Sequence, residues 1–324
     1  MRNKKYIHLT RCRPGTGKTI TIVEAIQQVL YDNSNARIMA CAPSNSAADI
    51  IASRLMSKLR RNELFRFYAP SRFKNQVPDE LLSYTCTLPD GHFSIPSMDT
   101  LKSFRVIVST CVSASFAVNY GIARGHFTHI FIDEAGQATE PEAFVSIKTM
   151  ADSRTNVILS GDPKQLGPII RSGIARELGL EKSYLERLMS SDAYDLKNSY
   201  GKRYVFFLFT MYMRLICVFS VVKLTKNFRS HNAILTFPNK KFYDDELQPC
   251  ASPSTINMYL NSSYLPSKKF PVVFHSVYGK DDREASSPSF FNIDEILQVK
   301  SYVQRLKEDR KFRTGKRTYD LAGM

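Results

Sequence analysis

Residues 13–19, R-P-G-T-G-K-T, decide the fold class of this chain. An apolar run at residues 6–9 precedes this stretch, and apolar residues recur at helix spacing over residues 20–30 after it. Glycines between a strand and a helix let the backbone curl so that successive N–H groups point at one anion, and the helix presents its positive end to the same anion. The pattern predicts a phosphate-binding loop, and an ordinary basic turn before a helix is the weaker alternative.

The residue types within this loop each suit a particular contact. Lys18 would reach the β- and γ-phosphates of a nucleoside triphosphate, and the Thr19 hydroxyl would be a ligand of Mg²⁺. The full motif begins with glycine at the position where this chain has Cys12, so we expect the extra Cβ to strain the loop and weaken nucleotide affinity. The residues predicted to bind the nucleotide phosphates are Gly15, Thr16, Gly17, Lys18 and Thr19.

Further short apolar runs are rich in Val and Ile and are bounded by polar residues. They lie at residues 37–42, 105–110, 129–132 and 156–160, and a second helix is predicted over residues 47–59. Strands buried on both faces have this composition, and they occur in parallel sheets covered by helices. Right-handed crossovers bring the carboxyl ends of such strands to one edge. We therefore expect an α/β fold with a parallel sheet, and we interpret residues 66–100 as a surface excursion.

Two carboxylates, Asp133 and Glu134, follow the apolar run at residues 129–132. Adjacent acids at the carboxyl end of a buried strand repel each other unless a cation lies between them. Asp133 would hold Mg²⁺ through water, and Glu134 would orient and deprotonate an attacking water molecule. The alternative is an ordinary strand end at the surface, which the phosphate loop upstream makes less favourable.

The stretch S-G-D-P-K-Q-L at residues 160–166 follows the next apolar run. The Gln165 amide has a donor and an acceptor, so it can contact both a γ-phosphate and the attacking water and thereby sense hydrolysis. A glycine- and proline-containing turn without such a role is the alternative.

The stretch K-N-F-R-S-H at residues 226–231 combines an aromatic ring with a guanidinium. Arg229 would face the γ-phosphate from a second domain and couple the nucleotide state to domain closure, and Phe228 would stack on adenine. From these residues alone, a solvated basic turn is the better interpretation.

Composition bounds the possible partners. Lys and Arg number 45 against 30 Asp and Glu, a net charge of +15 that points to a polyanion, with nucleic acid as the first candidate.

The length of the chain bounds the number of domains. The 324 residues, 43% of them hydrophobic, suffice for one large or two ordinary globular domains. The six cysteines are scattered without a C-x-x-C pair, so neither zinc nor a disulfide framework is expected. No apolar segment follows the basic residues 1–5, so no signal peptide is expected.

Taken in order, these blocks resemble superfamily-one helicases of the Upf-like branch, and most closely the Armitage / MOV-ten-like RNA helicases. The resemblance implies two RecA-like domains of the P-loop NTPase type, hydrolysis of ATP with Mg²⁺, and 5′-to-3′ translocation on single-stranded RNA. It also implies a role in small-RNA (piRNA or siRNA) silencing with Argonaute- or Piwi-type partners, in cytoplasmic ribonucleoprotein granules. The stretches that carry it are P-G-T-G-K-T (14–19), A-P-S-N-S-A-A-D (42–49), V-S-T-C-V-S-A-S (108–115), D-E-A-G-Q-A-T-E-P-E (133–142), G-D-P-K-Q-L-G-P (161–168), L-E-R-L-M (185–189) and N-F-R-S-H (227–231).

The resemblance also assigns roles to individual residues. Glu134, Gln165 and Arg229 become the catalytic base, the sensor and the first arginine finger, and Phe228 takes the adenine-stacking position. Small hydroxyl and amide groups can bond phosphates and 2′-hydroxyls without reading bases. Without the family, capping of their own loops would be the better interpretation of such groups. The residues placed in loops that contact the RNA backbone are Ser44, Asn45, Ser109 and Thr110.

The resemblance divides the chain into three parts. Residues 1–200 form a nearly complete first RecA-like domain, residues 201–222 an apolar insert, and residues 223–324 a partial second RecA-like domain. Residues 205–222 carry one charge, Arg214, and their 18 residues lie at the lower limit for a membrane span. Because the segment falls between two blocks of one soluble motor, we expect no membrane association and prefer a translated intron or gene-model error. The end of the insert is interpreted as the first strand of the second domain.

Two alternatives to an RNA helicase stay open. The motif with the second arginine finger is not found before Met324, so the chain is also interpretable as a nucleotide- or RNA-binding fragment or scaffold without turnover. A DNA helicase of the same superfamily is the other alternative, because backbone contacts distinguish the two sugars weakly.

Overall fold

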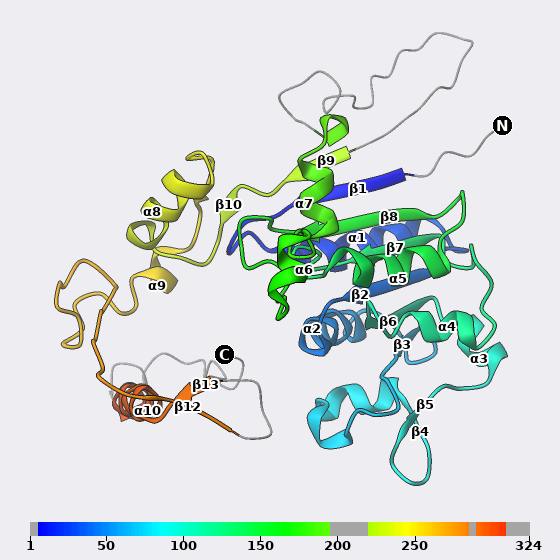
Figure 1. Ribbon diagram of the computed structural model, residues 1–324, viewed down its shortest axis with the longest axis horizontal. Helices are drawn as coiled ribbons and strands as arrows, with labels where there is room; N and C mark the ends of the chain where they lie inside the picture. Colours follow the sequence, from blue (N-terminus) through cyan, green and yellow to red (C-terminus); the bar gives the residue numbers. More distant parts are fainter. Residues whose placement is uncertain (1–5, 195–219, 285–289, 309–324) are drawn as a thin grey trace. The chain divides into compact units, whose positions relative to one another are not determined.

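A computed structural model describes residues 6–194, 220–284 and 290–308 (Figure 1). The chain divides into two compact units, Met1–Met258 and Tyr259–Met324. Most of the predicted apolar insert lies outside the described residues, so the predicted boundaries at residues 200 and 223 stay predictions. Within the described ranges, no helix combines the length and the apolar character that crossing a membrane requires.

The first unit is built on a parallel sheet of seven strands in the order β3-β6-β2-β7-β8-β1-β9. Figure 1 shows the strands side by side, from β9 at the top to β3 below. All five predicted strands are present, which confirms the α/β fold with a parallel sheet. The strands are β1 (Tyr6–Arg11), β2 (Ile38–Ala42), β3 (Leu64–Arg66), β6 (Val106–Thr110), β7 (His129–Ile132), β8 (Asn156–Gly161) and β9 (Ser220–Lys223).

Both faces of this sheet are covered, and the strand pleat divides the side chains between two hydrophobic cores. In β2, Ile38 and Ala40 belong to one core, and Met39 and Cys41 belong to the other. Because β2 is buried on both faces, its sequence Ile-Met-Ala-Cys-Ala is apolar throughout and does not alternate. The first core includes residues of α1 (Lys18–Asp32) and α2 (Asn45–Met56); the second includes residues of α4 (Ser115–Asn119), α5 (Glu140–Met150) and α7 (Tyr184–Met189).

Residues 66–100 are only partly a surface excursion, because several of their side chains enter the core. Tyr68, Leu81 and Phe93 are buried. Apolar and aromatic residues spaced among Pro and Ser therefore anchor the segment to the sheet. Its elements are η1 (Lys74–Gln76), η2 (Asp79–Tyr84) and the antiparallel pair β4 (Cys86–Thr87) and β5 (Phe93–Ser94), and α3 (Met98–Ser103) follows.

The end of the predicted insert forms part of the first sheet and not the first strand of a second one. β9 pairs in parallel with β1, in a register that sets Leu9 opposite Val221 and Arg11 opposite Lys223. The Leu224 N–H continues the ladder by donating to the Arg11 carbonyl at 3.0 Å. β1 would otherwise have been an edge strand with unpaired backbone groups, and β9 satisfies them.

The remaining described elements are short. The first unit also holds α6 (Gly173–Glu177), η3 (Asp192–Tyr194), the parallel pair β10 (Lys226–Asn227) and β11 (Gln248–Pro249), α8 (Asn232–Phe242) and α9 (Pro253–Ile256). The second unit holds the antiparallel pair β12 (Asp281–Arg283) and β13 (Phe290–Asn292), and α10 (Ile293–Glu308).

Candidate functional site

The loop between β1 and α1 has the backbone conformation that its glycines predict. Gly15 and Gly17 have φ of +67° and +81°, in the left-handed region that favours glycine. The Arg13 carbonyl accepts the Thr16 hydroxyl at 2.8 Å, which closes the turn. Gly17 is the N-cap of α1 and provides no side-chain cap, so N–H groups of the first helical turn stay available to an anion.

Cys12 fits at the start of the loop without the expected strain. Its backbone φ is not positive, and its side chain is fully buried. The Cys12 N–H donates to the Gly161 carbonyl at 2.9 Å, and its sulfur lies 3.4 Å from the Ser160 hydroxyl. Burial raises the pKa of the Cys12 thiol to about 12. The expectation of a strained loop was therefore wrong, because this position belongs to the core beneath the loop.

The acidic pair after β7 meets the end of the phosphate loop. Lys18 Nζ lies 2.8 Å from Glu134 Oε1, and the Thr19 hydroxyl donates to Asp133 Oδ2 at 2.9 Å. Asp133 is buried, and Glu134 has a φ of +51°, which is rare for a residue other than glycine. Backbone conformations of this kind concentrate at functional sites. The structure thus brings these four predicted residues together from elements more than a hundred positions apart in the chain.

The donor atoms at this point suit a magnesium ion. The Thr19 hydroxyl and the Asp133 carboxylate are oxygen ligands, and Mg²⁺ typically takes one or two such protein ligands while phosphates and water complete its shell. Within the described ranges, no group of three or more His, Cys, Asp or Glu side chains is arranged to hold a metal. This donor set is consistent with a Mg²⁺ site that has few protein ligands and that the phosphates of a nucleotide complete.

The loop that follows β8 lies against the loop that carries Asp133 and Glu134. The Ala135 N–H donates to the Ser160 carbonyl at 2.8 Å, and a Cβ at Gly161 would come within 2.8 Å of the Gly136 nitrogen. The Gln165 amide, on the exposed part of this loop, donates to Asp162 Oδ2 at 2.8 Å. The contact predicted between Gln165 and a γ-phosphate therefore stays a prediction.

The N-F-R-S-H stretch lies directly on the phosphate loop. The buried Asn227 donates from Nδ2 to the Pro14 carbonyl at 2.7 Å, and the Phe228 N–H donates to the Gly15 carbonyl at 2.9 Å. Asn227 Oδ1 also accepts the Arg229 N–H at 3.0 Å. Phe228 and Arg229 remain exposed beside the loop. Sequence analysis identified these two residues but missed Asn227, which joins them to the loop.

The four residues predicted to contact RNA differ in accessibility. Ser44 is exposed at the N-terminus of α2, where its hydroxyl accepts the Ala47 N–H at 3.2 Å. Asn45 and Thr110 are partly exposed, but the Ser109 hydroxyl is fully buried and donates to the Thr110 carbonyl at 3.0 Å. The prediction of a nucleic-acid contact for the Ser109 side chain is therefore corrected, because that side chain points into the core on the face of the sheet that includes Met39.

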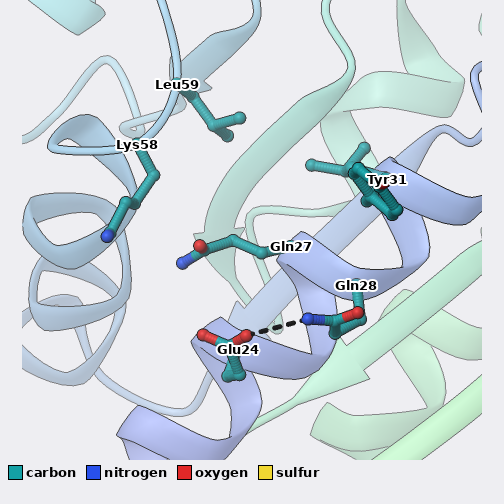
Figure 2. Close-up of a pocket in the computed structure, with 7 residues that line it drawn as sticks. Glu24, Gln27, Gln28, Tyr31, Lys58 and Leu59 are labelled. Carbon is teal, nitrogen blue, oxygen red and sulfur yellow. Dashed lines mark hydrogen bonds between the residues drawn. The ribbon is translucent and has the colours of Figure 1, made fainter.

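A separate cavity of about 380 Å³ lies away from these residues (Figure 2). Its walls come from the second half of α1 and from the residues just after α2, so it lies far along α1 from the phosphate loop. Figure 2 shows the Gln27 side chain of α1 extending toward Lys58, which follows α2. On α1 itself, Glu24 accepts a 3.0 Å hydrogen bond from Gln28. None of the predicted site residues lines this cavity.

Comparison with known families matches nearly the whole chain. Residues 1–88 and 95–173 match a family model described as AAA domain, and residues 207–316 match a second model with the same description. The first match alone covers more than half of the 324 residues. Its range includes the phosphate loop, the acidic pair and Gln165.

Individual relatives are similar over most of this chain. The protein mov-10-B.1 of Danio rerio is 42% identical over 298 residues, which are 90% of this chain and 28% of that protein. The RNA helicase Mov10l1 of Homo sapiens is 43% identical over 294 residues, 89% of this chain and 23% of that protein. The protein armi of Drosophila melanogaster is 32% identical over 318 residues, 88% of this chain and 26% of that protein. The chain thus spans between 23% and 28% of the length of these relatives. Similarity of this extent, together with the family matches, shows that the chain belongs to the Armitage / MOV-ten-like family of Upf-like superfamily-one helicases.

Proposed function

We propose that this chain is the motor part of an ATP-dependent RNA helicase that translocates 5′-to-3′ on single-stranded RNA. The observation that carries the proposal is the contact of Lys18 and Thr19 with Glu134 and Asp133, at 2.8 and 2.9 Å. A cation and a hydroxyl in the first turn of α1, in contact with two carboxylates that follow β7, match the needs of phosphoryl transfer to water, which depends on positioning and charge stabilisation.

The four residues have separate tasks in this proposal. Lys18 and the loop N–H groups bind the β- and γ-phosphates, so that Lys18 exchanges its bond with Glu134 for a bond with phosphate. Glu134 then orients the attacking water and accepts its proton. Thr19 directly, and Asp133 through water, would hold Mg²⁺, which when bound neutralises charge on the phosphate oxygens.

Phe228 and Arg229 act on the same nucleotide from the segment that lies on the phosphate loop. Phe228, which is 58% exposed, offers its ring to the adenine base. Arg229 offers a planar guanidinium to the γ-phosphate, where it would stabilise the charge of the transition state. The Asn227 bond to the Pro14 carbonyl supports this assignment, because it holds both residues beside the loop.

RNA would bind along the carboxyl edge of the sheet. Ser44, Asn45 and Thr110 present small polar groups there, and the net charge of +15 favours a polyanion. The name of the relative Mov10l1, an RNA helicase, supports RNA over DNA. A role in small-RNA silencing with Argonaute- or Piwi-type partners, in cytoplasmic ribonucleoprotein granules, is part of this proposal through the family.

A single-turnover ATPase assay with and without single-stranded RNA tests the proposal. We expect RNA-stimulated hydrolysis by the unaltered chain and no nucleotide binding by Lys18→Ala. Nucleotide binding without turnover would instead favour the alternative of a binding fragment or scaffold. Competition between RNA and DNA of one sequence at fixed salt separates an RNA from a DNA motor, and equal affinity for both would contradict RNA specificity.

A further inference from the structure

Arg13 is a fully buried cation inside the phosphate loop. Its Nη2 atom donates to a carboxylate oxygen of Glu246, while its Nε and Nη1 atoms have no hydrogen-bond partner among the described residues. The ring of Tyr243 lies 5.4 Å from the guanidinium carbon. A buried charge with one ionic partner depends strongly on it, because losing that partner leaves the charge unpaired where water cannot reach it.

The turn that carries Glu246 has a defined conformation of its own. The side chain of Asn239 accepts the Leu247 N–H at 2.9 Å and donates to the Leu247 carbonyl at 3.0 Å, which closes the turn. Asp244 and Asp245 both have a φ of +53°, in the left-handed region. The Glu246 carboxylate is therefore presented by a fixed turn and not by a free loop.

The Glu246 carboxylate lies between two cations from different parts of the chain. Lys223 Nζ, at the end of β9, lies 2.8 Å from both oxygens, and Arg13 approaches from the phosphate loop. The Lys223 hydrogen bond is the largest cause that holds the pKa of Glu246 below its ordinary value, and Arg13 adds to it. Glu246 therefore joins the phosphate loop to the edge of the sheet as a charged group.

A second contact joins the same turn to the loop after β8. The buried Tyr243 hydroxyl donates to Asp162 Oδ2 at 2.9 Å, and this oxygen also accepts the Gln165 amide at 2.8 Å. The turn at residues 243–247 thus contacts the phosphate loop through Glu246 and the Gln165 loop through Tyr243.

We propose that Arg13 and Glu246 are positioning residues, whose ion pair couples the shape of the phosphate loop to the 223–247 segment that carries Phe228 and Arg229. The inference rests on the proposed function, since it requires that the loop bind nucleotide. The pair holds the loop through the Arg13 side chain, while Asn227 holds it through the Pro14 carbonyl. A loop held at both points is preorganised for phosphate, and loss of the pair releases one of them.

A purely structural role for this ion pair predicts a different effect on nucleotide affinity. Removing a buried pair's partner always lowers stability, so reduced stability alone does not identify a positioning role. Only a positioning role changes nucleotide affinity at a temperature where the variant is fully folded. The exposed pair of Arg187 with Glu140, at 2.6 Å, joins α7 to α5 and offers a matched Glu-to-Gln control outside the phosphate loop.

The experiment measures the dissociation constant of a fluorescent ATP analogue with Mg²⁺ for the full chain and for Glu246→Gln, Arg13→Lys and Glu140→Gln. We expect Glu246→Gln to weaken binding about tenfold, in the range of coupled neighbours, and Glu140→Gln to leave it unchanged. Amide hydrogen exchange provides a second readout without nucleotide, and we expect faster exchange over residues 14–19 in Glu246→Gln. Should Glu246→Gln fail to fold, Arg13→Lys tests the pair in its place, because lysine keeps the positive charge. We expect Arg13→Lys to lose less nucleotide affinity than Glu246→Gln.

The outcomes separate this inference from the proposed function. Unchanged affinity and unchanged exchange in folded Glu246→Gln or Arg13→Lys, with nucleotide bound normally by the unaltered chain, would overturn the coupling alone. Failure of the unaltered chain to bind the analogue would reject the proposed function, and the inference with it.

Discussion

Lys18 and Glu134 bond directly to each other across the candidate active site, with Lys18 Nζ 2.8 Å from each carboxylate oxygen. Each charge therefore compensates the other before a nucleotide binds. A phosphate that takes Lys18 must displace Glu134, and this displacement frees the carboxylate for a water molecule. In the proposed function, this single exchange would link nucleotide binding to activation of Glu134 as the base.

Glu134→Gln tests this exchange. The amide keeps the shape but loses the negative charge, so Lys18 becomes easier for a phosphate to capture, while proton acceptance from water is lost. We expect nucleotide affinity equal to or higher than that of the unaltered chain, and hydrolysis slower by about 10²–10⁴-fold. Equilibrium binding and single-turnover hydrolysis measure the two effects separately. Turnover at the normal rate in Glu134→Gln would remove Glu134 from the role of base.

Alanine substitutions at Gly15 and Gly17 distinguish the cost of backbone strain from the cost of a steric clash within one loop. Both have a positive φ, but a Cβ at Gly15 would lie 2.5 Å from Asn227 Nδ2 and 2.8 Å from Arg229 Cβ, whereas one at Gly17 meets nothing within 4 Å. Gly17→Ala should therefore cost about 1–2 kcal/mol of stability through strain alone. Gly15→Ala should cost more and also displace the N-F-R-S-H stretch.

Urea unfolding of both alanine variants compares these costs. Gly91→Ala, in a hairpin turn with φ +88° and open space around it, is the control for strain outside the loop. Equal destabilisation by Gly15→Ala and Gly17→Ala would show that the contact between the loop and residues 227–229 does not form in solution.

Cysteine reactivity reports the burial of Cys12. Because burial raises the pKa of this thiol to about 12, it stays protonated at pH 8, where the thiolate is the reactive form. Cys250 is exposed, so iodoacetamide should alkylate Cys250 well before Cys12 in the folded protein, and both at similar rates in denaturant. Peptide mass spectrometry over a time course measures the two rates. Rapid alkylation of Cys12 in the folded protein would mean that the start of the phosphate loop is open to solvent.

Five of the seven strands were predictable from sequence because their signal is local, whereas the three-residue β3 was not predicted. The strands β2, β6, β7 and β8 each contain a continuous apolar run, because both faces of the sheet are covered. β9 was misassigned because its place depends on pairing between Val221 and Leu9, residues more than 200 positions apart. No local pattern shows which sheet such a strand joins.

The site was predictable to the extent that it consists of contiguous motifs. Lys18 and Asp133 belong to stretches whose spacing carries the chemistry, but the pair of Arg13 with Glu246 arises only from tertiary contact. Ser109 was misassigned because it was placed in a loop, whereas it is the fourth residue of β6 and shares a face with the buried Ile107. Since both faces of the sheet are covered, alternation along the strand alone does not distinguish Ser109 from the partly exposed Thr110.

Acid titration tests the electrostatic environment of Glu246. The hydrogen bond from Lys223 and the neighbouring Arg13 lower the pKa of Glu246 below its ordinary value of 4.5. A carboxyl with a lowered pKa in the folded state contributes stability at pH values above its ordinary pKa, and this contribution is lost as the pH falls through the lowered value. The unaltered chain should therefore be more stable than Glu246→Gln at pH 7, and the difference should shrink below about pH 4.5. Urea unfolding of both proteins from pH 7 to pH 3.5 measures this difference, with Glu140→Gln as the control. A difference that stays constant through this range would show that Glu246 is not ionically paired in the folded protein.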